Sequence, residues 1–162
     1  MHYRIFIFNS QSLGPINGEH LLSMLKASNF STLCAQYGLN LSEIERALTS
    51  LSLMSALDNQ ISPFLLLRYQ AQASARHLVL QSWPAESSQE KLILERALKS
   101  VHSETLKTAL KQTREIVAIE LSQMQLRDMG ILLAYELARW VVEKGRGLMR
   151  GLDGNWYRLN GH

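Results

Sequence analysis

Apolar positions fall into two spacings along the chain. The shorter spacing, about two residues, predicts six β-strands. In each of these stretches, β-branched, leucine or aromatic side chains alternate with polar ones or form a short continuous run. The predicted strands are residues 4–8, 63–69, 77–83, 115–121, 147–152 and 155–159. The first is apolar on both faces, which is typical of a central strand. The pattern in 115–121 also fits a continued helix and leaves that choice open.

The longer spacing, near 3.6 residues, predicts five helices. They are residues 19–27, 31–37, 42–51, 87–112 and 123–144. We expect the fourth helix to break near Ser103. Gly38 is expected to end the second helix in a left-handed conformation, and Gly145 to end the last one. Ser122 and Gln125 have the spacing of a capping box, so the last helix is expected to begin directly after Ser122.

Two pairs of predicted strands are close enough in sequence to form hairpins. The strands 63–69 and 77–83 are joined by a longer polar loop. The last two strands flank Asp153 and Gly154. An Asp-Gly pair readily adopts the positive φ angles of a two-residue type I′ turn. We therefore predict a tight hairpin at the end of the chain.

The order of the elements predicts an α+β fold in one domain that spans residues 1–162. Without the last helix and hairpin, this order resembles the split βαββαβ plan of ferredoxin-like folds. We therefore expect a mixed or antiparallel sheet in ferredoxin-like order. A helical hairpin would be inserted near the N-terminus, and an extra helix plus a β-hairpin would follow at the C-terminus.

Composition favours a protein of the cytoplasm. Charged residues make up 19% of the chain, and Cys34 is the single cysteine, which fits a reducing compartment. The apolar run at the N-terminus is too short for a signal peptide. The longest apolar stretch, residues 129–142, is interrupted by Glu136 and Arg139. No membrane span is therefore expected.

Residues 31–48 have the spacing of a helix-turn-helix. Cys34 is the small residue that lets two helices pack closely, Gly38 makes the turn, and Ile44 anchors the second helix. The stretch resembles helix-turn-helix DNA-binding segments. That resemblance implies a second helix that enters the major groove of DNA.

The charges of that second helix argue against DNA as a partner. Its first turn carries Glu43 and Glu45, which a phosphate backbone repels, and Arg46 is its only basic residue. A helical hairpin that packs on the sheet explains the same spacing. The formal net charge of +3 is spread along the chain and forms no basic stripe. Nucleic acid is therefore not an expected partner.

No motif for catalysis, for a cofactor or for a metal stands out, so we predict none of the three. The histidines lack the spacing of a metal-binding pair on one helix. Glu120 is the residue to weigh, because on a strand it would share a face with Ile116 and Ala118. A pocket for a small ligand or substrate would lie beside it. The alternative is a glutamate at the edge of the sheet that pairs with an arginine.

The last helix and hairpin carry the residues expected to contact a partner. The helix 123–144 is apolar over most of its circumference, which fits either a core helix or half of a dimer contact. Arginines beside aromatic residues are typical of interface anchors, and also of surfaces that stack single-stranded bases. The candidate interaction residues are Tyr135, Trp140, Arg146, Arg150, Trp156, Tyr157 and Arg158.

These observations favour a non-enzymatic protein-interaction or regulatory protein of the cytoplasm. We expect a homodimer that buries at least about 1,000 Å² through helix 123–144 or the terminal hairpin. A hairpin that folds back on the helix would cover the same apolar surface without a second copy. DNA binding through 31–48 is the alternative function. A small-ligand binder or enzyme with a pocket near Glu120 is the second alternative.

Overall fold

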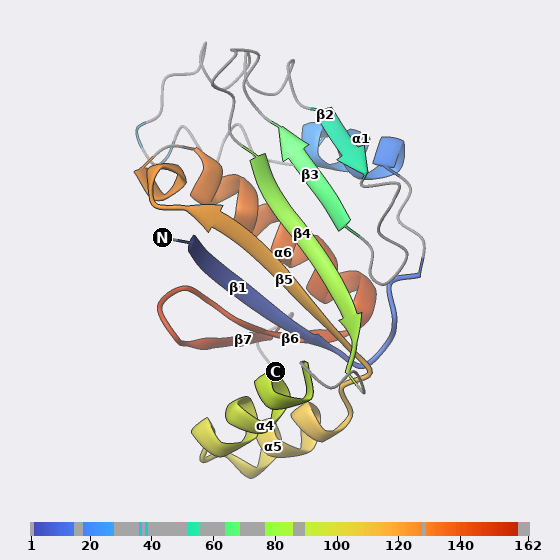
Figure 1. Cartoon of the computed structure of the whole chain (residues 1–162), viewed down its shortest axis with the longest axis vertical. Helices are drawn as coiled ribbons and strands as arrows, with labels where there is room; N and C mark the ends of the chain where they lie inside the picture. Colours follow the sequence, from blue (N-terminus) through green and yellow to red (C-terminus); the bar gives the residue numbers. More distant parts are fainter. Residues whose placement is uncertain are drawn as a thin grey trace.

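The computed structural model contains one antiparallel sheet of seven strands. The structure describes residues 2–14, 18–27, 36, 38, 52–55, 64–68, 77–85, 90–127 and 129–158. The strands are β1 (His2–Asn9), β2 (Ser52–Ser55), β3 (Phe64–Arg68), β4 (His77–Pro84), β5 (Glu115–Ser122), β6 (Gly147–Arg150) and β7 (Trp156–Arg158). Their order in the sheet is β2-β3-β4-β5-β1-β6-β7, which Figure 1 shows from β2 at the upper right to β7 at the lower left.

The α+β class and the antiparallel sheet agree with expectation, but the ferredoxin-like strand order is not found among the described strands. A split βαβ unit needs a helical crossover between parallel strands. Here the helices between β4 and β5 join neighbours that pair antiparallel. β1 lies between β5 and β6 and is antiparallel to both. β1 and β5 are apolar on both faces, so their pairing places both in the middle of the sheet.

One face of the sheet is covered by α6 (Gly130–Gly145) and α1 (Gly18–Ala27), which lie behind the sheet in Figure 1. The apolar residues on this side form the larger core. Its fully buried members include Ile5, Ile7, Leu21, Leu25, Leu78, Leu80, Val117, Ile119, Leu133, Leu137 and Val141. We call this side of the sheet the helix face.

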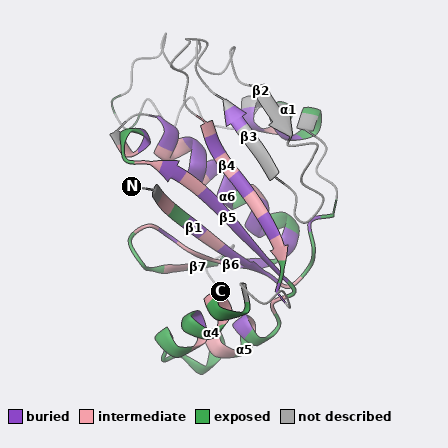
Figure 2. Ribbon diagram, viewed as in Figure 1, coloured by how far each residue is buried: buried purple, intermediate pink, exposed green. Residues whose placement is uncertain are grey.

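Among the described residues, the opposite face is covered at one end only. α4 (Glu90–Ser100) and α5 (Glu104–Lys111) pack there against Phe8, Ile116 and Leu148. The burial colours in Figure 2 change along β1, from buried beside α4 and α5 to exposed near its start. Arg4 is exposed and Phe6 is half-buried on this side. We call the part of this side beyond α4 and α5 the open face.

Several predicted elements are confirmed. β1, α1, β5, and the hairpin of β3 and β4 lie where the sequence pattern placed them. The long helix breaks near Ser103 as expected, because the Ser103 side chain accepts a hydrogen bond from the backbone N–H of Leu106 and starts α5. The short edge strand β2 was missed, since its four residues show no clear alternation.

The predicted helices 31–37 and 42–51 and the turn between them lie outside the described residues, apart from Gln36 and Gly38. Gln36 is helical, and Gly38 follows in a turn with a φ of 80°. This left-handed conformation is the one predicted for Gly38. The remainder of the helix-turn-helix-like stretch, including Cys34 and Ile44, lies outside the described residues.

The prediction that the last helix begins directly after Ser122 is wrong. The Ser122 N–H does donate to Gln125 Oε1, at 2.7 Å, but Gln125 also donates from Nε2 to the carbonyl of His77 on β4. These two bonds hold the chain in a 3₁₀ turn, η1 (Met124–Arg127). The helix α6 therefore begins only at Gly130.

α6 ends at Gly145 as predicted, but the left-handed residue at its end is Arg146, with a φ of 49°. Gly145 is needed for space instead. Asn9 is fully buried, and a Cβ added at Gly145 or at Gly147 would overlap its side chain. Ser10 Oγ donates to the carbonyl of Arg146, and this bond joins the end of β1 to the end of α6.

The terminal hairpin forms, but its turn is not the predicted two-residue type I′. Arg150 pairs with Trp156, so five residues connect β6 and β7. Gly154 N–H donates to the carbonyl of Gly151, and only Gly154 in this loop has a positive φ. Asp153 stays at negative φ because its carboxylate accepts bonds from the Asn155 N–H and the Tyr157 hydroxyl. Such side-chain bonds favour the longer turn.

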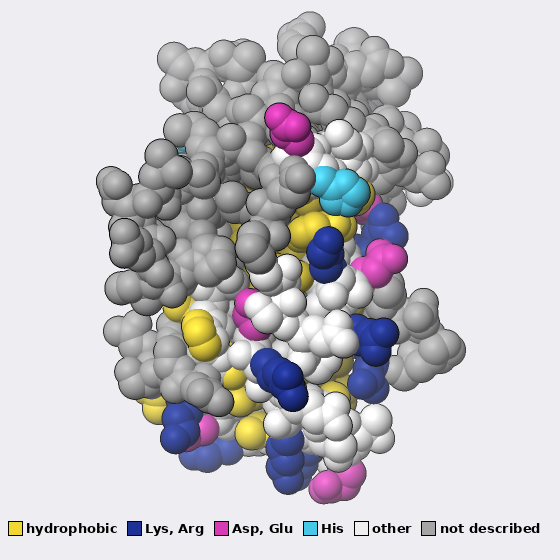
Figure 3. All heavy atoms as spheres, turned by 90° about the vertical axis from the view of Figure 1, so that its right-hand side faces the viewer, with side chains coloured by type: hydrophobic (Ala, Val, Ile, Leu, Met, Phe, Trp, Pro, Cys, Tyr) yellow, Lys and Arg dark blue, Asp and Glu magenta, His cyan; other side chains and the backbone are white. Residues whose placement is uncertain are grey.

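None of the described helices is long and apolar enough to cross a membrane. Figure 3 shows one side of the molecule, where lysines and arginines are interspersed with acidic and uncharged side chains.

Candidate functional site

The central strand β1 is paired on both sides over only half of its length. β5 pairs with all of it, from His2 to Asn9. β6 pairs only with the second half, from Phe6 to Asn9. No other described strand pairs with residues 3–5 on the β6 side. The first half of β1 therefore has a free edge inside the sheet, beside the turn of the β6–β7 hairpin.

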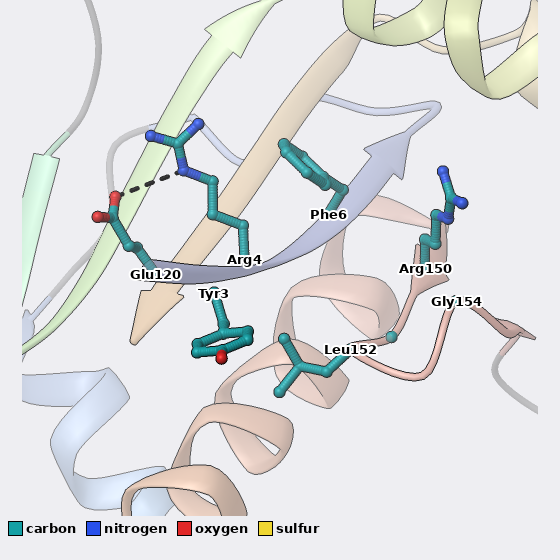
Figure 4. A pocket seen from close by; sticks show the side chains of 8 residues that line it. Tyr3, Arg4, Phe6, Glu120, Arg150, Leu152 and Gly154 are labelled. Carbon is teal, nitrogen blue, oxygen red and sulfur yellow. Dashed lines mark ion pairs between the residues drawn. The ribbon is translucent and has the colours of Figure 1, made fainter. Parts of the chain in front are cut away.

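This gap between β1 and the hairpin turn is a pocket of about 550 Å³, which we call the notch. Its lining comes from β1, β5, β6 and the turn. The lining residues are Tyr3, Arg4, Phe6, Glu120, Arg150, Gly151, Leu152 and Gly154. Figure 4 shows β1 on one side of the notch and the hairpin turn on the other.

The lining residues belong to both faces of the sheet. Tyr3 and Leu152 are half-buried and pack against the helix-face core. Arg4 lies on the open face, where it pairs with Glu120, and Phe6 pairs with Arg150 in the next row. The notch is thus bordered by side chains from both faces of the sheet. It occupies the place that a further strand beside β1 would take.

Glu120 and Arg4 form an ion pair across β5 and β1. The Arg4 Nε lies 3.5 Å from Glu120 Oε2, and these residues are direct cross-strand partners. The Arg4 side chain is 49% exposed and that of Glu120 is 19% exposed, so solvent screens the pair. The predicted face for Glu120 and its pairing to an arginine are confirmed, but Glu120 lies on the inner strand β5 and not at an edge of the sheet. The charge of Arg4 is largely balanced inside the notch.

Arg150 is held differently. Its guanidinium carbon lies 5.8 Å from the centre of the Trp156 ring, which is a cation–π arrangement. Trp156 in turn packs against Phe8, with 5.6 Å between ring centres. No carboxylate of the described residues lies within ion-pair distance of Arg150. Among the described residues, the lining of the notch therefore carries one positive charge, on Arg150, that no acid within ion-pair distance neutralises.

The far wall of the notch is fixed to α6 by Tyr135. The hydroxyl of Tyr135 accepts a hydrogen bond from the backbone N–H of Leu152 at 2.9 Å. Burial raises the pKa of Tyr135, and the negative charge of Asp153 adds to the increase, while the bond from Leu152 opposes it. The phenol is therefore neutral at physiological pH and holds the turn away from β1.

Asp153 keeps the same turn rigid from its exposed side. The hydroxyl of Tyr157 donates to Asp153, and this bond is the main reason that the pKa of Asp153 is lowered. The Asn155 N–H donates to the same carboxylate. Gly151 is buried between these groups, where a Cβ would press against Asp153, Tyr157 and the Tyr135 hydroxyl.

The seven candidate interaction residues do not form one site. Arg150 lines the notch, and Trp156 supports it from the open face. Tyr135 and Tyr157 hold the turn. The other three lie apart.

Trp140 packs against the helix-face core with Lys144 over its ring. Arg146 is the exposed left-handed residue after α6. Arg158 lines another pocket, of about 420 Å³, beside α5.

Sequence reasoning missed most of the notch, including Tyr3, Arg4, Phe6 and Leu152. A signal was available in β1, where Arg4 is the one charged residue among the apolar and aromatic residues from Tyr3 to Phe8. An arginine on a central strand needs solvent or an acid on its face of the sheet. That requirement indicates an uncovered part of the sheet.

The notch offers binding groups rather than a reaction centre. It has two guanidinium groups, one carboxylate engaged with Arg4, a phenol and a free strand edge. Within the described parts of the chain, no group of three or more histidine, cysteine, aspartate or glutamate side chains is placed to hold a metal ion. Comparisons with protein-family models, with curated proteins and with solved structures give no match for this chain.

Proposed function

We propose that this is a non-enzymatic protein-interaction protein of the cytoplasm, which binds an extended segment of a partner protein in the notch. The segment adds to the sheet as a strand beside residues 3–5 of β1. The observation that carries the proposal is the half-paired central strand. β6 leaves β1 after Arg150, and the space that it leaves is open to solvent.

The backbone chemistry of the notch supports strand addition. A strand edge presents a row of N–H and C=O groups that pair readily with another chain. Strand addition of this kind is a common mode of peptide recognition, in which backbone bonds give affinity and pockets for alternate side chains give specificity. The notch has walls for both sets of side chains. Tyr3 and Leu152 lie on one side, and Phe6 and Arg150 lie on the other.

The volume of the notch and the expected compartment of the protein fit this role. A volume of about 550 Å³ lies within the range of about 300–1,000 Å³ that is typical of ligand sites. Cys34 as the single cysteine supports a reducing compartment. Glu120 is engaged with Arg4, and no second acid or base stands beside it among the lining residues, which favours binding over catalysis.

A displayed library of random twelve-residue peptides tests the proposal. Selection on the immobilised full chain is expected to enrich extended sequences. Their binding is then measured by fluorescence polarisation on the wild type and on two variants. Leu152→Trp places an indole in the notch and should weaken binding at least about tenfold, since a filled site leaves no room for the added strand. Leu92→Trp is the control, because Leu92 is 54% exposed on α4, away from the notch.

NMR titration of the unmodified protein gives an answer that does not depend on the folding of Leu152→Trp. Shifts confined to the amides of β1 and of the turn 151–154 would support the proposal. Enrichment of no peptide, or shifts confined to α6, would overturn it. A small anion that displaces no peptide but shifts the Glu120 region would favour the alternative of a small-ligand binder.

A homodimer through α6 is a second candidate, favoured by the side chains on the outer side of that helix. Ile131, Leu132 and Trp140 are only partly buried there, although the hairpin turn covers Tyr135. An isologous contact along this side would complete their burial. Light scattering at micromolar concentration should then give the mass of two chains. A mass of one chain, 18.4 kDa, would overturn the homodimer.

A further inference from the structure

We infer that the notch selects an acidic partner segment, with an aspartate or glutamate side chain bound by Arg150. The inference rests on the proposed strand addition and names the chemistry of its ligand. It follows from how differently the two arginines of the notch are engaged.

Arg4 has little charge to offer a ligand, because Glu120 lies beside it at 3.5 Å. Arg150 lies in the neighbouring row of the open face, as the cross-strand partner of Phe6. Its guanidinium carbon lies 5.8 Å from the centre of the Trp156 ring, and no carboxylate of the described residues pairs with it. The N–H groups at the edge of a guanidinium remain available to a carboxylate, which they bind in a fork with two parallel bonds.

The position of Arg150 matches the pleat of an added strand. Successive side chains of a strand point to opposite faces of the sheet. A segment beside β1 therefore directs every second side chain to the open face, where Arg150 stands at the end of β6. The intervening side chains face Tyr3 and Leu152, which are apolar or aromatic. The expected ligand alternates an acidic residue with apolar ones.

The net charge of the whole chain also favours an acidic partner. The formal net charge is +3, which attracts an acidic segment at long range. A single-stranded nucleic acid would bring the same charge. It would also need an aromatic ring with a free face for base stacking. The Trp156 ring has Phe8 on one side and Arg150 near it as well, so a peptide fits the arrangement better.

The test uses the peptides selected on the wild-type chain, amidated at the C-terminus so that only side chains supply carboxylates. We expect at least one aspartate or glutamate at a fixed position. Its replacement by the matching amide should weaken binding about tenfold, as loss of a charge-assisted bond predicts. Arg150→Gln should weaken binding to the same extent, and the two changes together should cost no more than either alone. Arg158→Gln is the matched control, because Arg158 lies on β7 beside α5, outside the notch.

Glu120→Gln should have the opposite effect. It releases Arg4 and removes a negative charge from the lining, so acidic peptides should bind several-fold more tightly. A variant that merely disturbed the fold would not strengthen binding. Raising the salt concentration should weaken the wild-type complex more than the Arg150→Gln complex.

The outcomes separate the two proposals. If no peptide is enriched, strand addition itself fails. If peptides bind in the notch without an acidic residue, or if Arg150→Gln leaves their affinity unchanged, strand addition stands and the acidic preference is overturned. A twelve-nucleotide oligothymidylate that displaces the peptides at micromolar concentration would also overturn it, in favour of single-stranded nucleic acid.

Discussion

The Tyr135 hydroxyl accepts the backbone N–H of Leu152, and this bond fixes the hairpin turn at a distance from β1. The turn is thereby tied to α6 rather than to the neighbouring strand. The free edge of β1 and the notch both depend on this arrangement, because a turn released from α6 has the backbone groups to pair with residues 3–5.

Tyr135→Phe should destabilise the protein by about 1 kcal/mol, the usual contribution of one such hydrogen bond. The change keeps the ring in the core and leaves the Leu152 N–H without its partner. Urea denaturation measures the effect. Tyr157→Phe serves as the control, since Tyr157 is 42% exposed and should give a smaller loss. Equal losses of stability for both variants would show that the bond to Leu152 contributes no more than the exposed Tyr157 hydroxyl does.

Stability should also fall at alkaline pH through Tyr135. Its pKa in the folded protein is raised above the ordinary value of 10.0, mainly by burial. The folded state therefore favours the neutral phenol, whose stabilisation is complete below pH 10 and is lost as the pH rises through the raised pKa. Thermal unfolding measured from pH 8 to pH 11 should show a smaller alkaline decline for Tyr135→Phe than for the wild type. Parallel curves would contradict the role of burial at this residue.

Gly145→Ala should cost about 1–3 kcal/mol, the range for an overpacked core. Its added methyl group would overlap the buried side chain of Asn9. Asn9→Ala removes the obstacle, so the double variant should be more stable than the sum of the two single changes predicts. Chemical denaturation of all four proteins gives the coupling free energy. If the two changes in unfolding free energy simply add, the Asn9 side chain does not limit the space at Gly145.

Duplex DNA should bind no more tightly than about micromolar at physiological salt, the range of non-specific contacts. The expectation rests on Glu43 and Glu45 in the segment that resembles a helix-turn-helix. A gel-shift assay with random-sequence duplexes, read at two salt concentrations, checks it. A salt-sensitive complex with nanomolar affinity would restore DNA binding as the leading function.

The sequence predicted elements better than it predicted their arrangement. The apolar pattern located β1 and β5, and the Ser103 cap located the helix break, because these features depend on residues close together in the chain. The start of α6 was misplaced because Gln125 bonds to His77, 48 positions away. The longer hairpin turn likewise depends on a contact between Asp153 and Tyr157 that the Asp-Gly signal does not contain.

The notch could not be predicted for the same reason. It exists because β6 pairs with only the second half of β1, and this register is a property of the assembled sheet. Arg150 was identified from its aromatic neighbours, and Glu120 from its strand face. Their common pocket needed the order β5-β1-β6, which differs from the expected ferredoxin-like order.

Hydrogen exchange at the amides of β1, followed by NMR with and without a selected peptide, tests strand addition most directly. In the free protein, the amides of residues 3–5 that face the notch should exchange fast, while those of Ile7 and Phe8 should be protected, because both β5 and β6 flank them. Saturating peptide should slow exchange at the notch-facing amides at least about tenfold, as new backbone bonds form. Peptide binding that leaves these amides unprotected would contradict strand addition at β1.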